Sequence, residues 1–249
     1  MVWFVSVFYS VGADAREPAT TFVLYDDKSD RTEIINPVLA EQAFLPCSTF
    51  KIPNTLIGLE TGVITDEKFT LKWDGKQRQI AEWNRDQDLA SALKNSVVWF
   101  YQEVARRIGE MRMKKYVELF QYGNRDTCCS IDQFWLDGKM RITARQQVEF
   151  LRRIEAGKLP VKPEHVALLR RLITLESAPG YTLQGKTGTG TQDGRNLGWL
   201  VGLVEKVEKP EHRWVYALLM VAAPGDKAPS REQRLVMVKK LLAARGILP

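Results

Sequence analysis

The sequence predicts an α+β fold in which an antiparallel sheet is flanked by helices and a largely helical lobe is inserted between its strands. Segments rich in β-branched and aromatic residues lie near both ends of the chain, whereas the middle shows helical periodicity. A last amphipathic segment follows the final strand and is expected to cover the sheet. At 249 residues, of which 45% are hydrophobic, the chain can bury one large core. We therefore expect a single domain over residues 16–249, with the mostly helical lobe at about residues 65–180.

The strands are predicted from short β-rich runs separated by turns. Residues 21–25 and 31–35 flank a polar turn, a pattern typical of a β-hairpin. Three further runs, at residues 181–186, 197–205 and 213–221, are joined by turns and indicate an antiparallel meander.

The helices are predicted from apolar periodicity and from their end signals. Gly62 ends a helix that begins near Ser48, because glycine is favoured just after the end of a helix. Thr143 is expected to cap another helix through its hydroxyl, with Gln146 completing a capping box. Including these, the expected helices cover residues 48–61, 88–93, 97–108, 111–120, 144–155, 163–175 and 231–244.

The charges and histidines exclude several classes of function. The net charge is +6, yet basic and acidic residues are interleaved without a basic run, so we do not expect nucleic-acid binding. The two histidines, His165 and His212, lie in polar surroundings and are expected to be exposed. Neither belongs to a metal-binding motif or to a nucleophile elbow. We therefore expect no metal site, and a lysine as the base in any serine chemistry.

The cysteines and the N-terminus leave alternatives open. Cys47 precedes a candidate nucleophile and is interpreted as a small buried thiol rather than as a rival nucleophile. Cys128 and Cys129 are adjacent, and an adjacent pair does not bridge easily. Residues 1–15 begin as an apolar run and end in a small-x-small sequence, which fits either the remnant of a secretory signal or a first β-strand.

Ser48 and Lys51 are the first candidate catalytic pair. Residues three apart on a helix share one face, so their hydroxyl and amine are expected to touch. A lysine can take the proton of a serine only if its pKa, ordinarily about 10.4, is lowered or its amine is chemically altered. Apolar neighbours such as Phe50 would exclude water from the amine, and a serine at a helix start has N–H groups suited to an oxyanion. The same spacing at Ser91 and Lys94 is interpreted as a chance pair.

A second serine and a second lysine, Ser96 and Lys186, follow in that order along the chain. Lys186 begins a Lys-Thr-Gly sequence at the end of a predicted strand. A lysine, a hydroxyl and a glycine at that place suit the binding of a substrate carboxylate. Thr189 would then offer a backbone N–H as a second oxyanion donor. Taken alone, this sequence also fits a glycine-rich hairpin turn.

Together, the motifs at Ser48, Ser96 and Lys186 resemble those of the penicillin-recognising serine enzymes. Four sequence variants narrow the resemblance to the class D, oxacillinase-type serine β-lactamases, and it runs from about Phe22 to the C-terminus. These variants are Ser96-Val97-Val98, Tyr122-Gly123-Asn124, Phe134-Trp135-Leu136 and Gly198-Trp199-Leu200-Val201-Gly202.

The resemblance implies roles for the catalytic residues. Ser48 is the nucleophile that becomes acylated. Lys51 takes up carbon dioxide and, as a carbamate, is the base for acylation and deacylation. Trp135 resembles the indole N–H donor that stabilises this group. Ser96 relays a proton toward the nitrogen of the β-lactam ring, supported by Lys186.

The resemblance also implies how the substrate is held. The oxyanion accepts hydrogen bonds from the N–H groups of Ser48 and Thr189. An arginine early in the last helix pairs with the substrate carboxylate, and the distance from the C-terminus favours Arg234 over its near rival Arg231. The implied substrate-binding residues are Thr187, Gly188, Thr189, Arg234 and Val98.

The implied function is the hydrolysis of β-lactam antibiotics outside the cytoplasm of a bacterium, without a metal or an organic cofactor other than carbon dioxide. Small-molecule β-lactams are the expected partners of a monomer or homodimer with no stable membrane span. One alternative is a β-lactam-sensing receptor domain, because sensing needs only that deacylation fails. Others are a penicillin-binding transpeptidase or carboxypeptidase, which the short chain disfavours, and a degenerate relative that merely binds.

Overall fold

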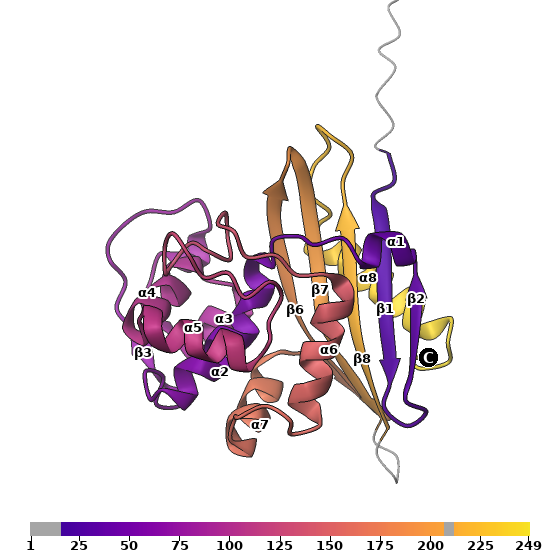
Figure 1. Cartoon of the computed structure of the whole chain (residues 1–249), viewed down its shortest axis with the longest axis horizontal. Helices are drawn as coiled ribbons and strands as arrows, with labels where there is room; N and C mark the ends of the chain where they lie inside the picture. The colour runs from indigo at the N-terminus through magenta and orange to yellow at the C-terminus, as the bar shows by residue number, and fades with distance from the viewer. Residues whose placement is uncertain (1–15, 207–211) are drawn as a thin grey trace, which may run out of the picture.

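The computed structural model describes residues 16–206 and 212–249, and its centre is a six-stranded sheet (Figure 1). Its strands are β1 (Ala19–Asp26), β2 (Arg31–Ile35), β5 (Thr174–Ala178), β6 (Tyr181–Gln192), β7 (Arg195–Lys206) and β8 (His212–Val221). They lie in the order β2-β1-β8-β7-β6-β5, and every neighbouring pair is antiparallel. The N-terminal hairpin therefore joins the last strand of the chain. A separate two-stranded sheet pairs β3 (Thr70–Leu71) with β4 (Gln87–Asp88).

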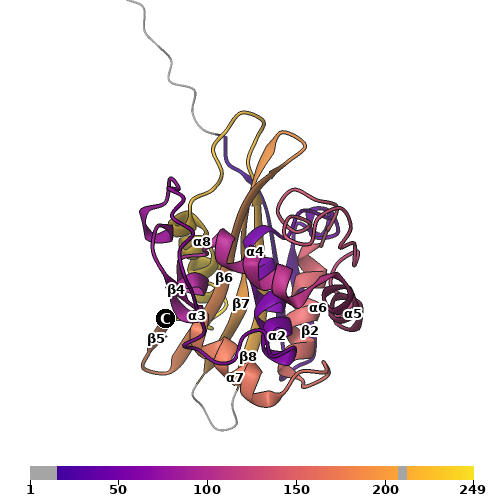
Figure 2. The ribbon, with the colours of Figure 1, turned by 90° about the vertical axis from the view of Figure 1, so that its left-hand side faces the viewer.

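Helices cover both faces of the sheet, and a group of them forms a lobe beside β6 (Figures 1 and 2). The final helix packs on β7 and β8 from one face, whereas α6 packs on β1 and β8 from the other. The helices are α1 (Pro37–Ala40), η1 (Cys47–Phe50, a 3₁₀-helix), α2 (Lys51–Glu60), η2 (Ala81–Trp83, also 3₁₀), α3 (Leu89–Lys94), α4 (Val98–Ile108), α5 (Glu110–Leu119), α6 (Ala144–Glu155), α7 (Pro163–Leu172) and α8 (Arg231–Ala243).

The alternation of side chains along the strands divides the core into two clusters. Phe22 and Tyr216 point to the face that α8 covers, where they pack with Leu242. Val23 and Ala217, each one residue further along its strand, belong to the larger cluster between the sheet and the helical lobe. The central strands β7 and β8 are buried on both faces, so their sequences are nearly continuous apolar runs rather than alternations of apolar and polar residues.

The predicted fold class is confirmed, with the hairpin, the meander and the main helices in place. One prediction was wrong: the helix expected to reach residue 175 ends at Leu172, and the chain continues as β5, because this segment pairs with β6. A second prediction ended the strand at residue 186. In the structure β6 extends to Gln192, so the Lys-Thr-Gly sequence lies inside the strand. The signal or strand expected for residues 1–15 lies outside the described residues, and the single-domain boundary stays a prediction.

The close approach of the paired strands β6 and β7 requires a glycine at residue 202. Gly202 pairs with Gly185, and a Cβ on Gly202 would collide with the carbonyl oxygen of Gln184 and lie 2.6 Å from the Cα of Gly185. Both obstacles are backbone atoms, which cannot rotate away. The glycine at this position is therefore required by close backbone approach.

We expect Gly202→Ala to lower the free energy of unfolding by about 3 kcal/mol, measured by urea denaturation, because overpacking displaces the central strands. Gly194→Ala is the control, since its φ is +71° but nothing lies within 4 Å of its Cβ position. That change should cost only about 1–2 kcal/mol for the left-handed backbone. Equal losses in the two variants would contradict the close-approach argument.

Candidate active site

Ser48 and Lys51 lie at the junction between η1 and α2. The expected helix at Ser48 begins as a 3₁₀ turn, and the α-helix starts only at Lys51. The Lys51 amine nevertheless donates a hydrogen bond to the Ser48 hydroxyl, with 2.8 Å between Nζ and Oγ. Ser48 lies in the first turn of η1. In this turn the N–H of Cys47 donates to the carbonyl oxygen of Trp135, and the N–H of Thr49 donates to that of Pro46. A hydroxyl and an amine are thus brought together at the start of a well-anchored helix.

Lys51 is buried, and aromatic side chains lie beside it. Phe50 stacks on Trp135 with 5.3 Å between ring centroids, and Nζ of Lys51 lies 5.4 Å from the centre of the Tyr101 ring. The lysine is 1% exposed, and its burial lowers its pKa from the ordinary range to about 7. Within residues 16–206 and 212–249 it forms no ion pair with a carboxylate. The pocket therefore favours the neutral amine.

Trp135 presents an unused donor in this pocket. Its indole Nε1 is buried and has no hydrogen-bond partner among the described residues. By contrast, the equally buried Trp199 donates from Nε1 to the carbonyl oxygen of Leu45 at 2.9 Å. An unsatisfied buried N–H is costly, so this donor suits an acceptor that the described residues do not themselves supply.

Strand β6 brings the second lysine to the site. Lys186, Gly188 and Gly190 alternate along β6 and therefore share one face. A Cβ on Gly188 would lie 2.9 Å from the carbonyl oxygen of Pro46, and one on Gly190 would lie 2.5 Å from Sγ of Cys47. The two glycines thus let η1 lie directly against β6, which places Lys186 beside the Ser48 turn.

Ser96 and Lys186 form a second hydroxyl–amine pair, with 2.9 Å between Oγ and Nζ. Lys186 also donates to the carbonyl oxygen of Thr187. Ser96 links α3 to α4 with a φ of +56°, a sparsely populated conformation for a residue other than glycine. Burial lowers the pKa of Lys186 well below its ordinary value, and the nearby charges of Lys51, Arg231 and Arg234 lower it further.

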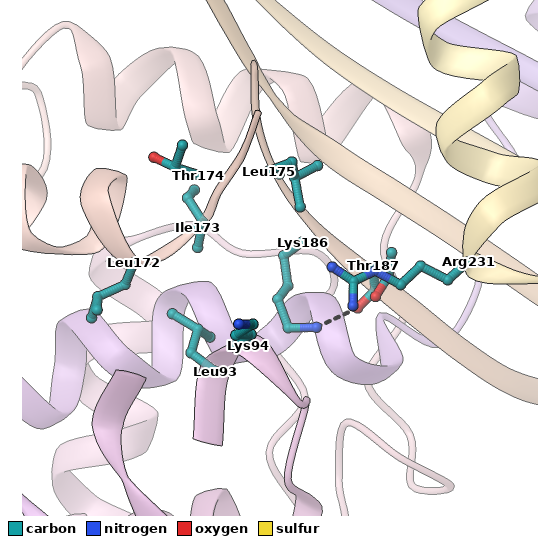
Figure 3. A pocket seen from close by; sticks show the side chains of 10 residues that line it. Leu93, Lys94, Leu172, Ile173, Thr174, Leu175, Lys186, Thr187 and Arg231 are labelled. Atoms are coloured by element: carbon teal, nitrogen blue, oxygen red, sulfur yellow. Dashed lines mark hydrogen bonds between the residues drawn. The ribbon is translucent and has the colours of Figure 1, made fainter. Parts of the chain in front are cut away.

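The two candidate arginines differ in their surroundings. Arg234 is buried, and its Nη1 donates to the carbonyl oxygens of Gly188 and Trp199, so it holds β6 and β7 together. Arg231 is exposed and lines a cavity of about 40 Å³ with Lys186 and Thr187 (Figure 3). Among the described residues, neither arginine forms an ion pair with a carboxylate.

Three further residues singled out from the sequence are Val98, Thr189 and Ser91, and each lies on or beside a regular element. Val98 is half-buried and begins α4, two residues after Ser96. Thr189 is exposed on β6, beyond the part of that strand that pairs with β5. Ser91 is occupied in a capping box with Asp88, so it is a structural serine rather than a second nucleophile.

The cysteines and histidines lie outside the chemistry described so far. Cys47 is buried, which raises the pKa of its thiol to about 12, whereas Cys128 and Cys129 are exposed and free. The histidines are not exposed as expected. Both are half-buried because they pair with carboxylates: His165 Nδ1 lies 2.6 Å from Glu60, and His212 Nε2 lies 2.6 Å from Asp26.

Two supporting residues carried no signal in the sequence. Gln147 on α6 donates from Nε2 to the Thr49 hydroxyl at 2.8 Å, although the two are 98 residues apart. Tyr101 on α4 places its ring near Lys51 and its hydroxyl 2.8 Å from that of Thr55. Both contacts are made between elements, so no local motif could have indicated them.

Comparisons with known proteins agree with this geometry. Residues 19–240 match the family of penicillin-binding protein transpeptidase domains. The β-lactamase OXA-48 of Klebsiella pneumoniae is 41% identical over 227 residues, which are 91% of this chain and 83% of that protein. The probable β-lactamase YbxI of Bacillus subtilis is 38% identical over 219 residues, which are 88% of this chain and 80% of that protein.

Solved structures give the same result. The class D β-lactamase YbXI from Nostoc is similar with a TM-score of 0.87 and 37% identity, covering 93% of this chain and 95% of that one. The class D β-lactamase FUS-1 (OXA-85) from Fusobacterium nucleatum subsp. polymorphum has a TM-score of 0.86 and 31% identity, covering 93% and 94%. The family match, the sequence identity and the structural similarity agree. The chain belongs to the class D β-lactamases, within the penicillin-binding protein transpeptidase-domain family.

Proposed function

We propose that this protein hydrolyses β-lactams through an acyl-enzyme on Ser48. The observation that carries the proposal is the 2.8 Å hydrogen bond between the Ser48 hydroxyl and a buried Lys51 whose pKa is lowered to about 7. A serine nucleophile needs an adjacent base, and this lysine is the basic group that contacts it. The similarity to class D β-lactamases supplies the reaction class.

The reaction begins when Ser48 Oγ attacks the ring carbonyl and loses its proton toward Lys51. The N–H groups of Ser48 and Thr189 would stabilise the oxyanion of the tetrahedral intermediate. When the ring C–N bond breaks, the leaving nitrogen receives a proton by way of Ser96. Lys186, hydrogen-bonded to that hydroxyl, supports the transfer. Water then attacks the ester, and Ser48 is released with its proton restored.

The residues around Lys51 fit the carbamate that the family implies. Carbon dioxide reacts with a neutral amine, and burial supplies that form at neutral pH. The unpaired Nε1 of Trp135 is a donor suited to one of its oxygens. When bound, carbon dioxide would supply an anionic base where an ammonium could not act as one. Lys51 and Trp135 would hold this group.

Substrate binding is assigned to the edge of β6 and to the start of α8. Thr187 and Gly188 would hold the substrate along β6, with Val98 on the facing wall. Arg234 is our choice for the substrate carboxylate, and Arg231 is the rival. The cations of this region have no carboxylate partner among the described residues, so an anionic ligand would be attracted to them.

The partners and setting follow from the proposed reaction. We infer that small-molecule β-lactams are the partners, that the protein acts outside the cytoplasm of a bacterium, and that it is a monomer or homodimer. Within residues 16–206 and 212–249, no helix has both the length and the apolar character needed to cross a bilayer.

Purified protein should turn over a chromogenic cephalosporin and a penicillin repeatedly, and the rate should rise with added bicarbonate. Ser48→Ala should abolish turnover, because the nucleophile is lost. Mass spectrometry of the quenched reaction should show the acyl group on the peptide that contains Ser48. A single stoichiometric acylation without release would make the protein a β-lactam sensor instead.

Trp135→Phe tests the indole N–H separately from ring packing. The variant keeps an aromatic ring against Phe50 but removes the unpaired donor. We expect it to need about 10-fold or more bicarbonate for half-maximal activity, since a hydrogen bond to a charged group contributes about 1.5–3 kcal/mol. Unchanged bicarbonate dependence in a well-folded variant would remove Trp135 from the proposed carbamate site.

The lowered pKa of Lys51 predicts a pH-dependent stability. Above about pH 7 the folded protein holds this amine neutral, whereas the unfolded chain keeps it protonated up to about pH 10.4. The unfolded state binds more protons in this window, so stability rises with pH there. In buffer free of carbon dioxide, the free energy of unfolding of the wild type relative to Lys51→Met should rise by about 1.4 kcal/mol per pH unit. If the difference in free energy of unfolding between the wild type and Lys51→Met stays constant from about pH 7.5 to about pH 9.5, which lie inside that window, Lys51 is not held neutral.

The two arginines can be separated with a substrate and its methyl ester. If Arg234 binds the carboxylate, Arg234→Ala should lower kcat/KM for the free acid by about 10- to 100-fold and for the ester much less. Arg231→Ala is the matched control from the same helix and should have the smaller effect. An equal loss on both substrates would restrict Arg234 to holding β6 and β7, and an acid-specific loss in Arg231→Ala would transfer the role to Arg231.

A further inference from the structure

The adjacent cysteines, Cys128 and Cys129, are not used by the proposed reaction. Their sulfur atoms lie 2.8 Å apart, and both side chains are exposed. Cys129 has a φ of +81°, an unusual conformation for a residue with a side chain. This backbone turns the two neighbouring thiols toward each other, whereas successive side chains in an extended chain point apart.

The loop that carries the two thiols is held in place by hydrogen bonds. Asp126 Oδ1 accepts from the N–H of Cys128 at 3.0 Å. Asn124 Oδ1 accepts from the N–H groups of Asp126 and Arg141, which fixes the start of the loop. After the pair, the carbonyl oxygen of Ser130 accepts from two following N–H groups. The thiols are therefore arranged before any ligand arrives, which lowers the entropic cost of binding both at once.

The pair opens onto a surface groove of about 410 Å³. Met111, which is 88% exposed, lines the same groove, so an apolar group beside the sulfurs would find a partner there. Asp126 and Arg125 line it as well. The third cysteine, Cys47, is buried in the core and is not available from this side.

We propose that Cys128 and Cys129 form a vicinal dithiol site that captures one thiophilic trivalent arsenic compound, such as an aryl arsenoxide. Two As–S bonds form and the arsenic–oxygen bond breaks. The two thiol protons leave with that oxygen as one water molecule, and arsenic remains trivalent. No oxidant or reductant is needed. The aryl group would lie along Met111.

The protonated state of Cys128 suits this condensation better than alkylation. Hydrogen bonding of the Cys128 thiol to Cys129 and to Asp126 favours its protonated form and raises the pKa of Cys128 to about 12, so it is protonated at neutral pH. Alkylating agents need the thiolate, whereas the arsenoxide oxygen accepts both thiol protons. Cys128 should therefore react slowly with iodoacetamide, whereas the pair should react readily with the arsenoxide.

The test uses the whole protein, reduced first and then freed of reductant without air, and titrated with phenylarsine oxide. Intact mass spectrometry should show one adduct per chain, removed by an excess of a dithiol but not of a monothiol. Cys128→Ser and Cys129→Ser should each weaken binding by about 100-fold or more, because chelation through the second sulfur is lost. Cys47→Ser is the matched control and should bind as the wild type does.

Three results would overturn the site. They are no adduct on the reduced protein, an adduct that maps to Cys47, or equal binding by the single-serine variants and the wild type. The thermal unfolding midpoint of each variant shows that a loss of binding is not a loss of fold. Because neither thiol takes part in the proposed acylation, the result of this experiment does not depend on β-lactam hydrolysis.

Discussion

The proposed active site depends on the exclusion of water from Lys51. An amine in water is protonated at neutral pH and cannot accept a proton from Ser48. Burial among aromatic rings lowers its pKa to about 7, and that single change makes a lysine usable as a base. Burying a lysine is destabilising, so the fold must supply the rest of the stability elsewhere, in the two apolar clusters on either side of the sheet.

Several features of the fold can be understood as means of keeping that pocket closed. Gly188 and Gly190 let η1 lie directly against β6, with Pro46 and Cys47 in close contact with the strand. On the other side, Gln147 from α6 bonds the Thr49 hydroxyl, which fixes the next residue of the same turn. Ser48, the proposed nucleophile, is thus held between a strand and a helix that are distant in sequence. Such a site is positioned by rigid elements rather than by a loop.

The sequence was informative where chemistry is local and uninformative where it depends on tertiary contacts. The spacing of Ser48 and Lys51 predicted their contact, and strand and helix periodicity predicted most elements. The strand after α7 was missed because Leu175 also fits the helical period, and only pairing with β6 decides the matter. The pairing of the two histidines with carboxylates could not be read from their polar neighbours either, since His212 meets Asp26 across 186 residues.

The excess of positive charge at the site connects the base to the substrate. Burial lowers the pKa of Lys186, and Lys51, Arg231 and Arg234 lower it further. None of these four basic groups forms an ion pair with a carboxylate in the described part of the chain. Unpaired cations repel one another, which favours neutral lysines and thereby the basic forms that the proposed chemistry requires. The same charges attract an anionic substrate. When its carboxylate binds, the repulsion is reduced, so the bound substrate favours a protonated Lys186 just when the ring nitrogen needs a proton. In the proposed reaction, the same set of charges therefore favours neutral, basic lysines in the free enzyme and a protonated, acidic Lys186 in the complex with substrate.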